Sequence, residues 1–211
     1  ERFSDPDFVR LLKLVSVISF RYSVVSRLNT NALEPVYHEA AKAVLDRKAA
    51  DPRAIFSILQ QIYVSDDKFT IDFSQLTLET NGQRKKMAKF ILAKLESDQS
   101  NRFCDPDTDP ATIEHILPEN PSEDWSASIS RSHWDEVIYR LGNLTLLEPS
   151  RNRMIGNLNY GEKVLAYRQS QYGITNRIAE EAPEEWTLPV LNKRQKAMAQ
   201  RARHIWRVDY D

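Results

Sequence analysis

The sequence predicts a predominantly helical α+β protein, with a helical N-terminal region over residues 1–100 followed by a mixed region over residues 101–211. Two observations support this fold class. Apolar residues recur at helical spacing through most of the N-terminal region, whereas strand-like and helix-like segments alternate after residue 110. Between them, the segment from Ser97 to Pro110 is polar and rich in Asp and Pro, which is typical of a connection between folded regions.

The N-terminal region contains four predicted helices. They are expected over about residues 8–25 and 32–48, from residue 51 onward, and from residue 82 onward. Between the third and the fourth, the large apolar residues of segment 69–73 alternate with polar ones. This alternation indicates a short strand or an extended linker.

The C-terminal region is expected to combine short strands with helices. A first strand leads into Pro118, where proline stops it. The elements expected after it are a short helix over 134–141, a strand over 143–147, a polar loop over 149–153, a helix over 160–172 and a basic amphipathic helix over 190–206.

Composition excludes several classes of protein. The chain has 41% hydrophobic and 28% charged residues, and no apolar stretch is long enough to span a membrane. Its single cysteine, Cys104, excludes a disulfide framework and indicates a reducing cytoplasm. The five glycines are scattered and form no nucleotide-binding loop. The chain begins at Glu1 rather than Met, so we expect it to be a piece of a longer protein.

Charge is unevenly distributed along the chain. Residues 105–136 carry one basic and nine acidic side chains, whereas residues 137–211 carry 12 basic and eight acidic ones. The acidic block could repel nucleic acid or gather cations near a metal site, and the basic block could contact phosphates. The pI near 6.5 is not that of a dedicated DNA-binding domain, so charge alone does not decide between these functions.

The segment Glu114-His115-Ile116-Leu117-Pro118 carries the first chemical signal. Successive side chains of a strand face opposite sides, so Glu114 and His115 are expected in different surroundings. A carboxylate beside an imidazole can supply a metal ligand next to a general base. Taken alone, however, a Glu-His pair is more often a surface feature than a site.

Two asparagines follow in an informative order. Asn143 is a polar residue on an otherwise apolar strand, and a buried amide there must be hydrogen-bonded. It either ties down neighbouring backbone or the His115 loop, or it forms a turn after Gly142. Asn152 lies in the polar loop that follows and adds another oxygen donor.

This order resembles the HNH nucleases, also called His-Me finger or ββα-metal nucleases. The closest resemblance is to the C-terminal nuclease domain of GmrSD-type and SspE-type bacterial restriction and anti-phage defence proteins. It covers about residues 82–206 and implies a ββα-metal core with flanking helices. The matching positions are Thr112 to Pro118, Trp125, Leu141 to Leu147, Asn152, Gly156-Asn157, Lys163 and Tyr167.

The resemblance implies a role for each matching residue. His115 would be the general base, and Asn143 would complete the catalytic group by holding the His-bearing loop. Glu114 and Asn152 would be metal ligands. Asn157 and Lys163 would support the site. Arg151, Arg153 and Arg168 would bind the DNA, and Lys163 is also a candidate phosphate contact.

The implied cofactor is Mg²⁺ or Mn²⁺. Many HNH enzymes hold a structural zinc ion with pairs of cysteines, which this chain lacks. Glu114 is longer than the Asp often found at its position, and Asn152 stands where many such sites have His. A ligand set rich in oxygen suits a hard cation. The implied reaction is hydrolysis of a DNA phosphodiester bond, with neutral His115 drawing a proton from water.

Three functions stay open at this stage. The chain could be a DNA endonuclease or nickase of a defence system, a catalytically silent DNA-binding or sensing module, or a helical interaction module of a larger protein. The resemblance also implies a partner domain of the same protein, N-terminal to this chain, that hydrolyses nucleotides or senses DNA modification. DNA is the expected partner, and no membrane is expected.

Overall fold

The computed structural model describes residues 3–210, which form two compact units. The first contains the chain up to Phe73 and from Ala202 onward, and the second runs from Ser74 to Arg201. Helices predominate, and the described chain has a single two-stranded sheet, which confirms the predicted α+β class. The division does not fall near residue 100, because helix α5 (Gly82–Ser100) packs against β2 and α9 of the second unit.

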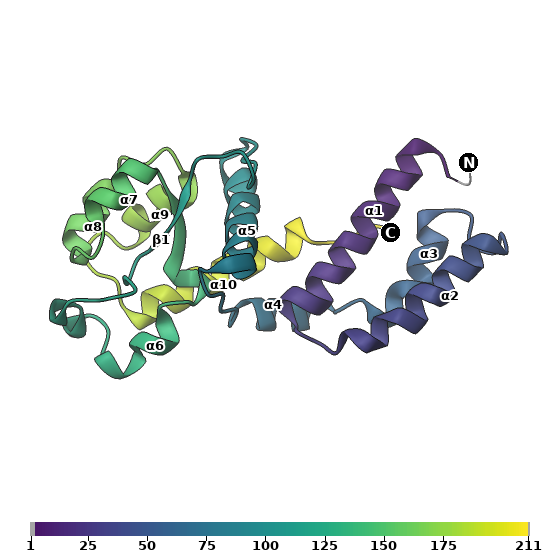
Figure 1. Ribbon diagram of the computed structural model, residues 1–211, viewed down its shortest axis with the longest axis horizontal. Helices are drawn as coiled ribbons and strands as arrows, with labels where there is room; N and C mark the ends of the chain where they lie inside the picture. Colours follow the sequence, from purple (N-terminus) through teal and green to yellow (C-terminus); the bar gives the residue numbers. More distant parts are fainter. Residues whose placement is uncertain (1–2, 211) are drawn as a thin grey trace. The chain divides into compact units, whose positions relative to one another are not determined.

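The first unit is built from helices (Figure 1). Helix α1 (Asp5–Ser19) continues directly into a π-helical turn, η1 (Phe20–Val25), so the apolar pattern over 8–25 spans both. The next elements are η2 (Thr30–Ala32), α2 (Leu33–Leu45), α3 (Pro52–Leu59), η3 (Gln60–Ile62) and α4 (Asp66–Phe73). Helix α3 packs against both α1 and α2.

The prediction of a strand or linker over 69–73 was wrong, because this segment belongs to helix α4. Phe69 and Phe73 are four residues apart and therefore lie on one face of a helix, where both are fully buried. Ile71 lies on the other face and is 60% exposed. In so short a segment, an alternating pattern and a helical pattern share the positions i and i+4, here Phe69 and Phe73, and only Ile71 differs between them.

Arg21 ties the C-terminal segment to the helices of the first unit. Its fully buried guanidinium forms an ion pair with Asp66 at 2.7 Å and lies 4.5 Å from the centre of the Phe69 ring. It also donates to the backbone carbonyls of Val64 at 2.8 Å and Trp206 at 2.6 Å. Because a buried charge must be paired and hydrogen-bonded, these contacts hold the segment after α10 in place.

The second unit surrounds a two-stranded antiparallel sheet with helices (Figure 1). Strand β1 (Thr112–His115) pairs with β2 (Leu144–Leu147), so that Glu114 lies opposite Thr145 and His115 opposite Leu144. The remaining helices are α6 (Trp134–Val137), α7 (Pro149–Ile155), α8 (Tyr160–Tyr167), α9 (Gly173–Glu181) and α10 (Leu188–Ile205), together with the short turns η4 (Glu123–Ala127), η5 (Arg131–His133) and η6 (Leu141–Asn143).

The core of the second unit lies between β2 and the C-terminal helices. Leu147, Tyr167 and Leu191 are fully buried in it. Trp125, Trp134 and Trp186 belong to the same cluster, as expected of tryptophans that anchor a core. Within residues 3–210, no helix has both the length and the apolar character that crossing a membrane requires.

The expected polar loop over 149–153 was also wrong, because these residues form helix α7. Pro149 occupies the first helical turn, where its missing N–H costs nothing. Gly156 follows the helix with a positive φ of 36°, a conformation that glycine adopts readily. Asn152 is therefore presented by a helix that follows the second strand.

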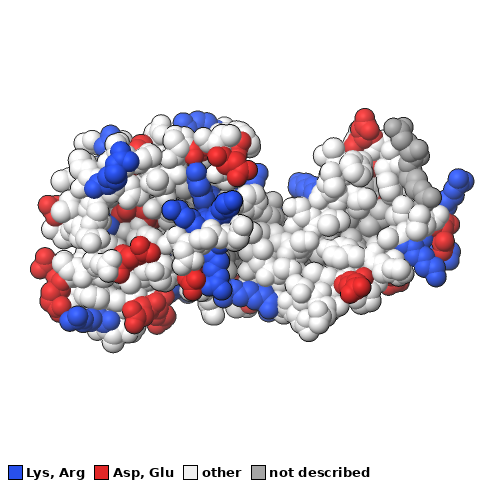
Figure 2. All heavy atoms as spheres, in the orientation of Figure 1, with Lys and Arg blue, Asp and Glu red and all other residues white. Residues whose placement is uncertain are grey.

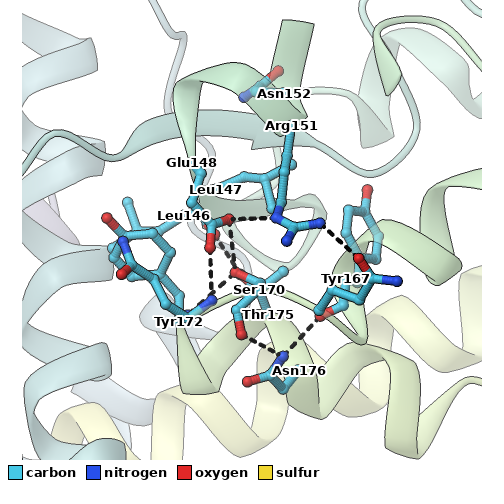
Figure 3. Close-up of polar contacts among 12 residues, drawn as sticks. Leu146, Leu147, Glu148, Arg151, Asn152, Tyr167, Ser170, Tyr172, Thr175 and Asn176 are labelled. Carbon is cyan, nitrogen blue, oxygen red and sulfur yellow. Dashed lines mark hydrogen bonds and ion pairs between the residues drawn. The ribbon is translucent and has the colours of Figure 1, made fainter. Parts of the chain in front are cut away.

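The single helix expected over 160–172 is interrupted, and the helix after it was not predicted. Helix α8 ends at Tyr167, and side chains take over the backbone groups of the turn that follows (Figure 3). The Asn176 amide donates to the carbonyls of Tyr167 at 2.8 Å and Ser170 at 2.9 Å. Glu148 accepts from the Ser170 hydroxyl at 3.1 Å. The helix expected over 134–141 is likewise limited to α6.

Candidate active site

A pocket of about 260 Å³ opens beside the end of strand β1. His115, the last residue of that strand, lines it together with Asn152 of α7 and Asn157 just after that helix. Glu114 lines it as well, so the structure brings four of the predicted site residues to one hollow. The other residues that line it are Thr80, Lys85, Ile113, Pro118, Glu119, Asn120 and Gly156.

A short hydrogen-bonded chain holds the His115 imidazole. Its Nε2 lies 3.2 Å from the Thr80 hydroxyl, which in turn lies 3.1 Å from Glu119 Oε1. A carboxylate only accepts, so the single hydroxyl hydrogen of Thr80 is donated to Glu119. Thr80 can then only accept from His115, so Nε2 carries the hydrogen. In neutral His115 the unprotonated nitrogen is therefore Nδ1.

The segment before α5 places Thr80 next to the imidazole. Leu78 N–H donates to the carbonyl of Tyr139 at 2.8 Å, and Thr77 forms an isolated antiparallel bridge with Arg140. The Tyr139 hydroxyl donates to Glu119 at 3.1 Å, so this carboxylate has a second donor. These backbone and side-chain bonds hold Thr80 and Glu119 beside the His115 imidazole.

Burial keeps His115 neutral. The side chain is 13% exposed, and burial lowers the pKa of His115 to about 4, assisted by the positive charges of Lys163 and Lys85 and opposed by Glu119. At neutral pH the imidazole is therefore unprotonated and can accept a proton. The same burial makes the protonated form costly.

Glu114, the residue before His115 on β1, also lines the pocket, but its side chain is almost entirely closed off from solvent. Glu114 is 3% exposed, and its Oε1 accepts from Lys163 Nζ at 2.7 Å and from the Tyr167 hydroxyl at 2.8 Å. Lys163 is fully buried and also donates to the carbonyl of His115 at 2.8 Å. Burial raises the pKa of Glu114, which the Lys163 ammonium opposes. Lys163 thus braces the strand and is too deeply buried to contact a phosphate.

Asn143 holds the backbone that follows His115. It belongs to η6, just before β2, and its side chain is fully buried. Its Oδ1 accepts from Leu117 N–H at 2.8 Å and from Trp186 Nε1 at 3.1 Å. Its Nδ2 donates to the carbonyls of Leu117 at 2.9 Å and Ile138 at 3.0 Å. All hydrogen-bonding atoms of the amide are therefore occupied, and none faces the pocket.

Asn152 is the predicted ligand whose donor atom is best placed for a cation. Its Nδ2 donates to Thr112 Oγ1 at 2.9 Å and to the carbonyl of Ile113 at 3.0 Å. Because both amide hydrogens are used, Oδ1 is the end that remains to bind a ligand. No group of three or more His, Cys, Asp or Glu side chains in residues 3–210 could hold a metal ion. A metal here would need amide oxygens beside a carboxylate, which are hard donors that fit Mg²⁺.

The three predicted DNA-binding arginines do not line this pocket. Arg151 points away from Asn152 into a polar network, with its guanidinium 3.8 Å from Glu148 and 3.1 Å from Gln169 Oε1 (Figure 3). Arg168 lines a separate hollow with Gln169. Arg153 is exposed on α7. Helix α7 thus places Asn152 at the pocket but Arg151 and Arg153 outside it.

Lys85 is a pocket residue that sequence reasoning missed. It lies in the first turn of α5, and no carboxylate within residues 3–210 is placed to form an ion pair with it. Figure 2 shows Lys and Arg side chains gathered around this end of α5. The run Arg84-Lys85-Lys86 was a visible signal, but it lies in the region that we expected to be only a scaffold. Glu119 was missed as well, although its position directly after Pro118 in the Glu114–Pro118 segment was a visible signal.

Comparison with known proteins identifies one family. Residues 63–201 match a family model described as "GmrSD restriction endonucleases, C-terminal domain". This stretch covers well over half of the chain and contains all the residues of the pocket. No curated protein matches the chain.

Proposed function

The chain belongs to the family of GmrSD restriction endonuclease C-terminal domains, and from this membership we propose that it is a metal-dependent DNA endonuclease or nickase. It would hydrolyse phosphodiester bonds in a restriction or anti-phage defence system of the bacterial cytoplasm. The observation that carries this proposal is the pocket in which neutral His115, Lys85 and the amide of Asn152 meet.

His115 would act as the general base. The bond from Nε2 to Thr80 leaves Nδ1 as the atom that accepts a proton from water. The resulting hydroxide oxygen forms a bond to phosphorus while the bond from phosphorus to the leaving 3′ oxygen breaks. The protonated imidazole is then stabilised by the Glu119 carboxylate, 3.8 Å from Nε2. Glu119 would thereby offset part of the cost of charging a buried histidine.

Asn152 would hold the cofactor, Mg²⁺ or Mn²⁺, with Asn157 and the second oxygen of Glu114 as further donors. When bound, this ion would stabilise the negative charge that develops on the phosphate and on the leaving oxygen. Lys163 would support the site by neutralising Glu114 Oε1 and by bracing the carbonyl of His115. Asn143 would fix the turn that carries the catalytic histidine.

Lys85 would bind a phosphate of the substrate. An ammonium group at the pocket wall that forms no ion pair with a described residue attracts the DNA backbone electrostatically. Arg151, Arg153 and Arg168 would contact phosphates farther from the scissile bond, because they lie outside the pocket. The DNA would thus be held first by the exposed basic residues and then positioned by Lys85.

Supercoiled plasmid tests the assignment. With Mg²⁺ or Mn²⁺, the wild-type chain should produce relaxed circles if it nicks and linear DNA if it cuts both strands. His115→Ala should slow this reaction by about 10²- to 10⁴-fold, the range for loss of a general base. His38→Ala, which removes an exposed histidine of α2, should leave the rate unchanged. Equal cutting by His115→Ala would exclude the catalytic role.

Binding of Mn²⁺ tests the cofactor separately from cutting. Paramagnetic resonance of Mn²⁺ titrated with the protein should show weaker binding for Asn152→Ala than for wild type. Arg153→Ala, a neighbouring exposed residue of α7, is the matched control. Identical Mn²⁺ binding by wild type and Asn152→Ala would remove Asn152 from the ligand set.

A silent DNA-binding or sensing module is the second candidate. The pairing of Glu114 with Lys163 favours it, because this carboxylate already has a cation at 2.7 Å and adds little net charge to attract a metal. Such a module would retard plasmid in a gel without relaxing or cutting it. The same plasmid experiment therefore separates the two functions.

A further inference from the structure

A second pocket, of about 410 Å³, lies wholly within the first unit. Arg10 and Lys13 of α1 and Arg53 of α3 line it, together with Arg207 from the segment after α10. Among the described residues, the only carboxylate in its lining is that of Asp209. These residues lie outside 63–201, so the pocket is not part of the matched domain.

Two of the four cations carry most of the uncompensated charge. Arg207 lies 2.5 Å from Asp209, and Arg10 lies 3.4 Å from Asp7, so both have an acidic neighbour. In the described part of the chain, no carboxylate is within ion-pair distance of Lys13 or Arg53. Like charges around one hollow repel each other, and a bound anion would relieve that repulsion.

The fold holds these cations together. Arg10 and Lys13 are three residues apart on α1, so they share one face of that helix. The Asp51 side chain accepts from Ala54 N–H at 2.8 Å and caps α3, which places Arg53 in its first turn. The walls of the pocket therefore come from regular helices with fixed starts.

The C-terminal wall is anchored as well. Tyr210 lines the pocket, its ring centre lies 5.5 Å from that of Phe56, and its hydroxyl donates to the carbonyl of Arg10 at 3.4 Å. Arg21 holds the same segment at Trp206. The three parts that supply the cations are thus packed on one another within the first unit.

We propose that this pocket binds phosphate groups of a DNA backbone. Guanidinium and ammonium groups are the side chains that proteins use for phosphate, and arginine can bind it through two parallel hydrogen bonds. DNA is favoured over a single small anion because the cations come from three segments and surround a wide hollow, which suits several phosphates in succession. Contact at this pocket raises the effective concentration of the same DNA for other sites on the chain.

This inference goes beyond the proposed function, because the pocket shares no residue with the His115 site. DNA binding is measured on the His115→Ala protein, which separates binding from cutting. A fluorescent duplex is titrated by anisotropy at KCl concentrations from about 50 to about 200 mM, in the His115→Ala background and with Lys13→Gln/Arg53→Gln added. The added pair should weaken binding by about 10-fold and reduce the salt slope by roughly 2, about 1 for each phosphate that is no longer neutralised.

The matched control is Lys42→Gln/Lys48→Gln, which removes the same charge from other positions of the same unit. It should weaken binding by less than about 2-fold, the effect of a long-range charge screened by salt. Equal weakening in the control and in the pocket variant would overturn the proposal, as would unchanged binding by the pocket variant. Thermal unfolding of both variants verifies that each is folded at the assay temperature.

Inorganic tripolyphosphate distinguishes a free anion from a DNA backbone. If the pocket variant bound tripolyphosphate more weakly but bound the duplex as before, the ligand would be a small phosphate compound and the DNA proposal would be overturned. Weaker duplex binding with the predicted salt slope supports DNA. Neither result depends on whether His115 cuts, so a failure here and a failure of the proposed function can be told apart.

Discussion

The two faces of strand β1 differ although they are set by adjacent residues. Glu114 is enclosed, with its carboxylate bonded to Lys163 and Tyr167. His115 lines the pocket, with Nε2 held by Thr80 and no hydrogen-bond partner for Nδ1 among the described residues. The Glu114 side chain therefore holds the strand, whereas the His115 side chain keeps one ring nitrogen towards which a ligand could bind. Adjacent residues of a strand can have such different surroundings because successive side chains alternate in direction.

The comparison also shows how the backbone around His115 is held in place. A catalytic group needs an orientation that thermal motion does not disturb, and bonds behind it supply that orientation. Lys163 donates both to Glu114 and to the carbonyl of His115, so the closed face braces the open one. Asn143 does the same for Leu117, two residues farther along. Variants of the two faces should accordingly have different effects.

The largest effect on stability is expected on the closed face. Lys163→Met leaves the Glu114 carboxylate buried without its cation, which should lower the free energy of unfolding by about 3–5 kcal/mol. Glu114→Leu/Lys163→Met removes both charges and should recover most of that loss. Urea unfolding followed by tryptophan fluorescence measures both. If the single and the double variant lose the same stability, the ion pair is not what holds this face.

A smaller and pH-dependent effect is expected on the open face. The pKa of His115 is lowered to about 4 in the folded protein, below the value of about 6.5 for an unfolded histidine. The unfolded chain therefore takes up this proton first as the pH falls from 6.5 to 4, and stability decreases over that window. The contribution is about 3 kcal/mol, from roughly 1.4 kcal/mol per pH unit.

His115→Asn removes this titration. The difference in unfolding free energy between wild type and His115→Asn should thus shift in favour of the variant as the pH is lowered from about 7 to about 4. Urea unfolding at several pH values measures it. A difference that stays constant over this range would mean that the imidazole is not buried as described. In the cutting assay, the same pKa predicts a rate that does not decline between about pH 8 and about pH 6 through protonation of His115.

The smallest effect distinguishes the pocket from the surrounding surface. Lys85→Gln should reduce the rate of plasmid cutting by about 10-fold, because a charge-assisted hydrogen bond to phosphate is worth about 1.5 kcal/mol. Arg168→Gln removes an equal charge from outside the pocket and should change the rate by about 2-fold at most. Comparable effects of the two variants would show that Lys85 contributes only to the overall field.

Much of the fold and the site could be predicted from local pattern. The predominantly helical α+β class was confirmed, and so was the resemblance to GmrSD-type C-terminal domains, which matches residues 63–201 rather than the expected 82–206. Of the predicted site residues, Glu114, His115, Asn152 and Asn157 line one pocket. Local pattern failed at segments 69–73 and 149–153, where a few residues fit a helix and an extended segment equally well. Segment 69–73 is helical with Phe69 and Phe73 buried on one face. Segment 149–153 is helical with Pro149 in the first turn.

By itself, the sequence determined which residues are candidates for chemistry and in what order they occur. Residue type and near-neighbour spacing are local properties, and they suffice to place a histidine at a strand end and an amide beside the next strand. Only the tertiary structure decided the partners: Lys163 for Glu114, and Thr80 with Lys85 for His115. These partners lie between 30 and 49 residues away, and only the packing of α5 and α8 around the sheet brings them close, because long-range contacts depend on the whole core.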